Sequence, residues 1–210
     1  MILKNSNDSM SLSTSERDKL IKKTASAYEK VLDALGFDWR NDPNMSDTPN
    51  RVAKSFVDDL IVGCYTDQPK ITAFENVNKY DGLVFQGNID VMSICSHHHL
   101  PFIGHAHVAY LPDPNGKIIG LSKLNRTVEW FARRPQVQEN LTQQIHDFLN
   151  ITIEGNAGIA VMIEASHMCA CVRGVKHDST MMTSKLSGAF KDNPAVRDEF
   201  YNFVKRLEKQ

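Results

Sequence analysis

Two groups of possible metal ligands stand out in the sequence. The first is Cys95-Ser-His-His-His99, and the second is His167-Met-Cys-Ala-Cys171. Thiolates and imidazoles are the donors that zinc prefers. Because neither group alone has the ligand count and geometry of a closed structural site, we expect the fold to bring the two together. That arrangement suits a catalytic metal with one position open for water, although a structural zinc with two cysteines and two histidines fits the spacing equally well.

The first group can supply two ligands to one metal only if the chain turns directly after Cys95. Neighbouring residues of a strand point to opposite faces, so Cys95 and His98 do not converge in an extended segment. With a turn, Cys95, His98 and Cys169 can form one ligand set. His97 and His167 then flank the metal, where imidazoles that titrate near neutrality can move protons to and from a water molecule.

Two pairs of basic residues lie at the starts of predicted helices. Arg51 and Lys54 lie in the first turns of one helix, and Lys123 and Arg126 lie at the start of another, which Ser122 can cap. Residues three apart share a helix face, and the N-terminus of a helix favours anions. The repeated pattern predicts a phosphate site, whereas a single pair of this kind is more often only a solvated surface.

The elements that must position these residues follow from hydrophobic periodicity. A capping box at Ser13 and Glu16 predicts the start of an amphipathic helix. Strands are expected at residues 82–95 and 102–111, with residues 117–119 returning as the second half of a hairpin. Further helices are expected at about residues 122–133, 137–148 and 194–207, and residues 180–190 could add a strand.

Residues 156–171 are expected to form the strand that carries the second ligand group. Seven of its residues fall at odd positions, namely Ile159, Val161, Ile163, Ala165, His167, Cys169 and Cys171. Odd positions share one face of an unbent strand. The face therefore begins in the core and ends with His167, Cys169 and Cys171 at the rim of a buried sheet.

The composition is that of an ordinary globular protein. The chain has 210 residues, 41% of them hydrophobic and 23% charged, and its formal net charge is -1. A chain without a net basic field lacks the electrostatic signature of general nucleic-acid or membrane binding. Four cysteines do not form a disulfide framework in a chain of this length. With no signal peptide and no run of transmembrane length, a cytoplasmic location is expected.

The expected architecture is α+β, with a helical region before the sheet. Residues 1–14 are expected to form a flexible tail, residues 15–75 an N-terminal helical region and residues 76–210 the catalytic domain.

Several motifs, in order along the chain, resemble those of the GTP cyclohydrolase I family. They are Asp47-Thr-Pro-Asn-Arg-Val-Ala-Lys54, Cys95-x-His97-His98, Gly120-Leu-Ser-Lys-Leu-Asn-Arg126, Arg134-Pro-Gln-Val-Gln-Glu-Asn-Leu-Thr-Gln-Gln-Ile145, and His167-Met-Cys169 with Arg173-Gly174. The resemblance extends from about residue 15 to the end of the chain.

The resemblance implies a role for each matching residue. Cys95, His98 and Cys169 match the zinc ligands, and His97 and His167 match the histidines that transfer protons. Glu139 matches the carboxylate that accepts hydrogen bonds from the guanine ring, and Gln138 matches a residue of the same pocket. The other implied substrate-binding residues, most of them suited to a triphosphate, are Ser122, Lys123, Arg126, Arg173, Arg51 and Lys54.

The resemblance also implies a reaction and an assembly. Family members use zinc-activated water to open the imidazole ring of GTP at C8, release formate and form 7,8-dihydroneopterin triphosphate. That product leads to folate, tetrahydrobiopterin or deazaguanine nucleosides. The implied structure is the tunnelling fold, an antiparallel sheet backed by helices, in rings of usually ten subunits with active sites at subunit interfaces. The expected partners are therefore GTP and further copies of the chain, without nucleic acid or membrane.

The sequence departs from the family pattern near the metal. Ser96 stands where the family usually has glutamate, and His99 and Cys171 offer spare donors. Two other interpretations remain: a nitrile reductase of the queuosine pathway, which has the same fold and a cysteine nucleophile but no zinc, and a non-catalytic zinc-stabilised binding module. The paired cysteines and His98 disfavour the first. The second leaves Glu139 and the basic pairs unexplained.

Overall fold

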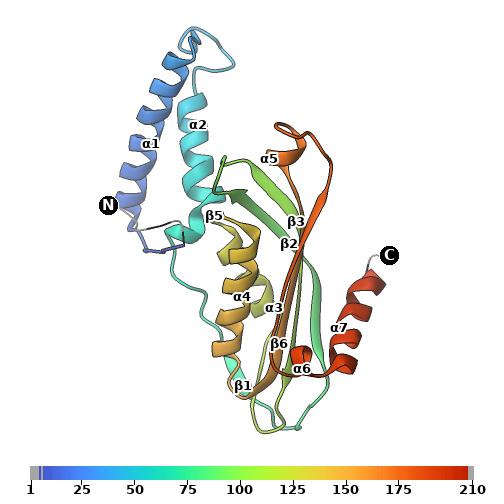
Figure 1. Cartoon of the computed structure of the whole chain (residues 1–210). Helices are drawn as coiled ribbons and strands as arrows, with labels where there is room; N and C mark the ends of the chain where they lie inside the picture. The colour runs from blue at the N-terminus through green and yellow to red at the C-terminus, as the bar shows by residue number, and fades with distance from the viewer. Residues whose placement is uncertain (1–4, 6, 208–210) are drawn as a thin grey trace. The chain divides into compact units, whose positions relative to one another are not determined.

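The computed structural model describes residues 5 and 7–207 (Figure 1). The chain divides into two compact units, residues 1–68 and residues 69–210. Within the described residues, no helix has both the length and the apolar character that crossing a bilayer requires.

The smaller unit is helical. Its segments are α1 (Thr14–Ala34), α2 (Thr48–Lys54), a π-helical turn (η1, Ser55–Leu60) and a 3-10 turn (η2, Val62–Cys64). The predicted capping box is confirmed, because the Ser13 hydroxyl accepts from the Glu16 amide while the Glu16 carboxylate accepts from the Ser13 amide. Its small buried core consists of Ile21, Ala25, Ala53 and Val57.

The larger unit is built on a five-stranded sheet with the order β5-β2-β3-β6-β7. Its strands are β2 (Val84–Cys95), β3 (Pro101–Pro112), β5 (Pro135–Gln136), β6 (Asn156–His167) and β7 (Thr180–Leu186). All neighbours are antiparallel except β5, which runs parallel to β2. A separate two-stranded sheet pairs β1 (Ala73–Glu75) with β4 (Lys117–Ile119).

Helices cover both faces of the large sheet. They are α3 (Leu121–Ala132), α4 (Gln138–Thr152), α5 (Met168–Cys171), α6 (Ala189–Asp192) and α7 (Pro194–Leu207). Alternation along β6 separates two cores: Val161 and Ile163 belong to the core that includes side chains of α3 and α4, and Met162 belongs to the core that includes side chains of α6 and α7. The architecture is α+β, an antiparallel sheet backed by helices, as expected of the tunnelling fold (Figure 1).

Two predicted strand arrangements are wrong. Residues 117–119 do not return beside β3, because β3 is already paired with β2 on one side and β6 on the other. The strand expected to continue to Cys171 stops at His167, whose partner Phe102 lies near the start of β3. Beyond that point β3 offers no partner, and Met168–Cys171 forms the helical turn α5. The donors of the second group therefore do not share one strand face.

Candidate metal and substrate site

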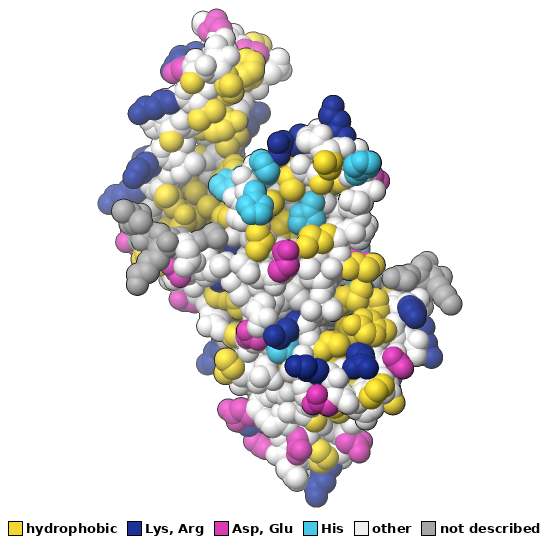
Figure 2. Space-filling view, in the orientation of Figure 1, with side chains coloured by type: hydrophobic (Ala, Val, Ile, Leu, Met, Phe, Trp, Pro, Cys, Tyr) yellow, Lys and Arg dark blue, Asp and Glu magenta, His cyan; other side chains and the backbone are white. Residues whose placement is uncertain are grey.

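Three donors from different segments converge at one end of the large sheet. Cys95 ends β2, His167 ends β6 and Cys169 lies in α5, and one ligand atom from each lies within 4.8 Å of the other two. Figure 2 shows histidine side chains gathered at this end of the larger unit, with Lys and Arg side chains nearby. We call Cys95, His167 and Cys169 the donor cluster.

The turn that the first ligand group requires is present. The His99 amide donates to the Cys95 carbonyl at 2.8 Å, and the Cys95 amide donates to the Leu100 carbonyl at 2.8 Å. This turn brings His97 Nδ1 to 3.7 Å from Cys95 Sγ. His98 is exposed and is not part of the donor cluster, in which His167 is the third donor. The structure thus brings together two of the three predicted ligands, and the assignment of His98 stays a prediction.

The His167 ring is held on its face and at its edge. It stacks on Phe102, a fully buried residue of β3, with 4.6 Å between ring centroids and 11° between planes. At the edge, His167 Nε2 lies 2.8 Å from Gln138 Oε1. Burial lowers the pKa of His167, and the negative charge of Glu139 opposes that shift. Glu139 itself is exposed in the first turn of α4, so a carboxylate lies near this imidazole.

The thiols of Cys95 and Cys169 place two soft sulfur donors close together. Desolvation raises the pKa of Cys169, the neighbouring Cys95 raises it further, and the Arg173 charge lowers it. The raised pKa disfavours the thiolate of Cys169 unless a cation is bound beside it, and a metal ion deprotonates its thiol ligands. Two sulfurs with a nearby imidazole match the donor set of zinc. The residues present therefore fit the metal that the sequence suggests.

The predicted phosphate-binding residues of α3 lie away from the donor cluster. The C-terminal end of α3 leads into β5, where Gln136 pairs with Cys95, whereas Ser122, Lys123 and Arg126 lie toward the other end of the helix. At 1.5 Å per residue, Lys123 lies roughly 14 Å along the axis from that end. Its ammonium group donates to the Lys70 carbonyl at 3.2 Å. Within one chain, these residues and the donor cluster are not brought together.

The remaining predicted substrate ligands lie in different environments. Arg173 is exposed just after α5 and close enough to act on the Cys169 pKa. Arg51 and Lys54 belong to α2 of the smaller unit, where Arg51 Nε lies 3.1 Å from Asp47 Oδ2. Their roles toward a triphosphate stay predictions.

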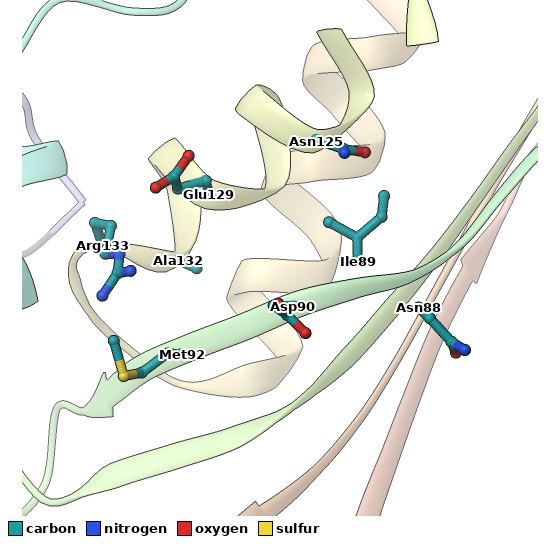
Figure 3. A pocket seen from close by; sticks show the side chains of 8 residues that line it. All are labelled: Asn88, Ile89, Asp90, Met92, Asn125, Glu129, Ala132 and Arg133. Carbon is teal, nitrogen blue, oxygen red and sulfur yellow. The ribbon is translucent and has the colours of Figure 1, made fainter. Parts of the chain in front are cut away.

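A cavity of about 330 Å³ lies between α3 and β2 (Figure 3). Glu129 from α3 and Arg133, which directly follows that helix, line it together with Asp90 and Met92 from β2. Among the described residues, its lining includes none that the sequence assigns to the metal or to GTP.

Two features that position His167 were not predicted from the sequence: its stacking on Phe102 and the end of β6 at His167. The stacking of Phe102 under His167 depends on the register between β3 and β6, for which no local motif exists. The placement of His167 among the donors depends on where β6 ends. A signal for Phe102 was nevertheless available, since it is an aromatic residue at the start of a predicted strand directly after the first ligand group.

The comparisons with known proteins agree with the motifs. The family model for GTP cyclohydrolase I matches residues 24–205. The chain is 43% identical over 200 residues to GTP cyclohydrolase 1 of Flavobacterium johnsoniae, an alignment that covers 94% of this chain and 86% of that protein. It is 46% identical over 173 residues to GTP cyclohydrolase 1 of Vibrio cholerae, covering 81% and 78% of the two chains. The chain therefore belongs to the GTP cyclohydrolase I family.

Proposed function

We propose that this enzyme opens the imidazole ring of GTP by zinc-dependent hydrolysis, releases formate and forms 7,8-dihydroneopterin triphosphate in the cytoplasm. The observation that carries the proposal is the convergence of Cys95, Cys169 and His167 beside Glu139. A soft metal site next to an exposed carboxylate suits a reaction on a purine base. A closed structural zinc site would leave the position of that carboxylate unexplained.

In this proposal, Cys95 and Cys169 hold the metal through their thiolates. His98 is the third ligand implied by the family resemblance, and it reaches the metal if its exposed side chain turns toward the thiols. When bound, zinc supplies a Lewis acid that makes water nucleophilic at neutral pH.

Glu139 is proposed to hold the base. Guanine presents its N1–H and N2–H donors side by side, and a carboxylate offers two acceptor oxygens with matching spacing. Lys123, Arg126 and Arg173 are proposed to bind the triphosphate with Ser122, Arg51 and Lys54. They take no part in bond breaking, and they place C8 of the base at the reacting position.

The two flanking histidines are proposed to transfer protons. His97 lies against the Cys95 sulfur, and the pKa shift of His167 favours its neutral form. A neutral imidazole can accept a proton as water adds to C8 and can return it to a ring nitrogen as the C8–N bond breaks. Hydrolysis of the second C8–N bond releases formate, after which the opened sugar rearranges and closes onto the diamine.

A ring-shaped assembly of two stacked pentamers is part of the proposal. In the described part of the chain, β5 covers only Ile94 and Cys95 of β2, so most of that strand forms one edge of the sheet while β7 forms the other. Unpaired edges are templates for pairing with another chain, and pairing one edge with the other in successive copies can close a ring. A neighbouring copy can then supply the start of α3 that a single chain holds away from its donor cluster.

The test is an incubation of the zinc-replete protein with GTP, followed by oxidation to fluorescent pterin and a parallel formate assay. The proposal predicts pterin and formate in equal amounts. Formate without pterin would contradict the proposed product and indicate a reaction that stops after ring opening. A folded, zinc-loaded protein that yields neither would overturn the proposed reaction.

A further inference from the structure

Both polar atoms of the Gln138 side chain form hydrogen bonds within the protein. The residue is 1% exposed at the start of α4, and the two N–H groups of its Nε2 are shared among three acceptors: the Ile163 carbonyl at 3.0 Å, the Met181 carbonyl at 3.0 Å and the Thr183 hydroxyl at 3.1 Å. Its Oε1 lies 2.8 Å from His167 Nε2. A residue with both amide atoms engaged in this way has no free group for a substrate.

The surroundings of Gln138 fix the orientation of its amide. The carbonyls of Ile163 and Met181 are acceptors only, so the atom that faces them must be the NH2 group. The opposite atom, which faces His167, is therefore the carbonyl oxygen. The orientation follows from two neighbours with a single possible role, which is the reliable basis for assigning an amide.

This orientation determines the proton position on His167. Since Gln138 Oε1 can only accept, His167 Nε2 must be the donor of the 2.8 Å hydrogen bond. In the neutral ring, the lone pair then belongs to Nδ1. The stacking on Phe102 fixes the plane of the imidazole ring, and the hydrogen bond to Gln138 fixes its tautomer and its rotation within that plane.

We propose that Gln138 is a positioning residue that keeps the proton of neutral His167 on Nε2 and presents Nδ1 as the base, instead of contacting guanine. The inference rests on the proposed role of His167 in proton transfer and deepens it. It also replaces the pocket-lining role that the family resemblance implies for Gln138.

A double-mutant cycle tests this proposal. In Gln138→Met, which keeps the length of the side chain but removes both hydrogen-bonding groups, kcat should fall roughly 10- to 100-fold with KM for GTP nearly unchanged. In a His167→Ala background, the same substitution should have almost no further effect, because Gln138 acts through the imidazole. A raised KM with an unchanged kcat would instead assign Gln138 to guanine binding and overturn the proposal.

Gln136→Met is the matched control for folding. Gln136 is also 1% exposed, and its amide donates to the Phe131 carbonyl and to Gln144 Oε1 without touching His167. Both variants should lower the melting temperature, since each leaves a buried carbonyl without its donor, but only Gln138→Met should lower kcat. An equal loss of kcat in both would reduce Gln138 to a structural role.

Neutron diffraction of the deuterated protein separates this inference from the proposed function. Deuterium on His167 Nε2, directed at Gln138, is the expected result, and deuterium on Nδ1 alone would overturn the inference whatever the kinetics show. If His167→Ala kept full activity while Nε2 carried the deuterium, the proton-transfer role would fail and the positioning of the ring would stand.

Discussion

The donor cluster and the start of α3 are organised in opposite ways. Cys95, His167 and Cys169 come from three segments and already lie together, with His167 held by a stacked ring and a buried amide. Lys123 and Arg126 come from one helix turn and lie apart from that cluster. The first region is preorganised by the fold of one chain, which suits reacting groups. The second is a basic helix start whose role depends on a ligand and, in our proposal, on a neighbouring copy.

The largest expected effect comes from breaking the donor cluster itself. Cys169→Ser should lose bound zinc and turnover together, by more than the roughly 10- to 100-fold that changes around a metal's ligands cause. Zinc content by atomic absorption and pterin formation measure the two losses. Cys171→Ser is the matched control and should keep both. Stoichiometric zinc and full activity in Cys169→Ser would remove that residue from the ligand set.

The next effect concerns the carboxylate beside the cluster. Glu139→Ala should weaken GTP binding on the order of 100-fold, since two hydrogen bonds to a charged acceptor are lost at about 1.5 kcal/mol or more each. Zinc content should stay unchanged, because Glu139 is not among the donors. Glu129→Ala, an exposed carboxylate on α3, serves as control. Titration calorimetry that found wild-type affinity for GTP in Glu139→Ala would refute its contact with the base.

A smaller effect is expected at the basic helix start. Lys123→Ala and Arg126→Ala should each raise KM for GTP about tenfold, which corresponds to 1.4 kcal/mol, with kcat and zinc content preserved. Their effect should shrink at high salt because exposed charges are screened. Lys191→Ala, an exposed lysine in α6, is the control. If KM for GTP in both variants equalled that of the wild type, these residues would not be triphosphate ligands.

Mixing variants tests whether the two regions meet across copies. Subunits with Lys123→Ala and Arg126→Ala carry an intact donor cluster, whereas Cys169→Ser subunits carry an intact helix start. After co-refolding in equal amounts, about one quarter of the sites between neighbours should be wild type in both parts. At GTP concentrations well below KM, where the basic residues matter, this restores about a quarter of the wild-type kcat/KM. If the kcat/KM of the mixture were no higher than the mean of the two separately refolded variants, each complete site would lie within one chain.

The sequence was most predictive where the signal is local. The capping box at Ser13 and the turn after Cys95 depend on neighbours along the chain, and both are confirmed. Errors arose where pairing decides the structure. The prediction for residues 117–119 failed because both edges of β3 are occupied, so that β4 pairs with β1 instead.

The site follows the same rule. The residue types of the two groups, Cys95-Ser-His-His-His99 and His167-Met-Cys-Ala-Cys171, were sufficient to predict a metal site, since few other functions need donors so dense in sequence. The position of His167 beside both thiols depends on where β6 ends, and the last partner of His167 on β3 is Phe102. The basic residues of α3 were recognised by type, but their separation from the cluster is a property of helix length and direction.

The most direct measurement is the zinc K-edge X-ray absorption spectrum of the purified, zinc-loaded protein. The account predicts two sulfur scatterers at about 2.3 Å and nitrogen or oxygen scatterers at about 2.0–2.1 Å, one of them with the pattern of an imidazole. That result would place both thiols on one metal with a position left for water. A shell without sulfur, or one with four sulfurs, would contradict the claim that Cys95 and Cys169 hold a catalytic zinc.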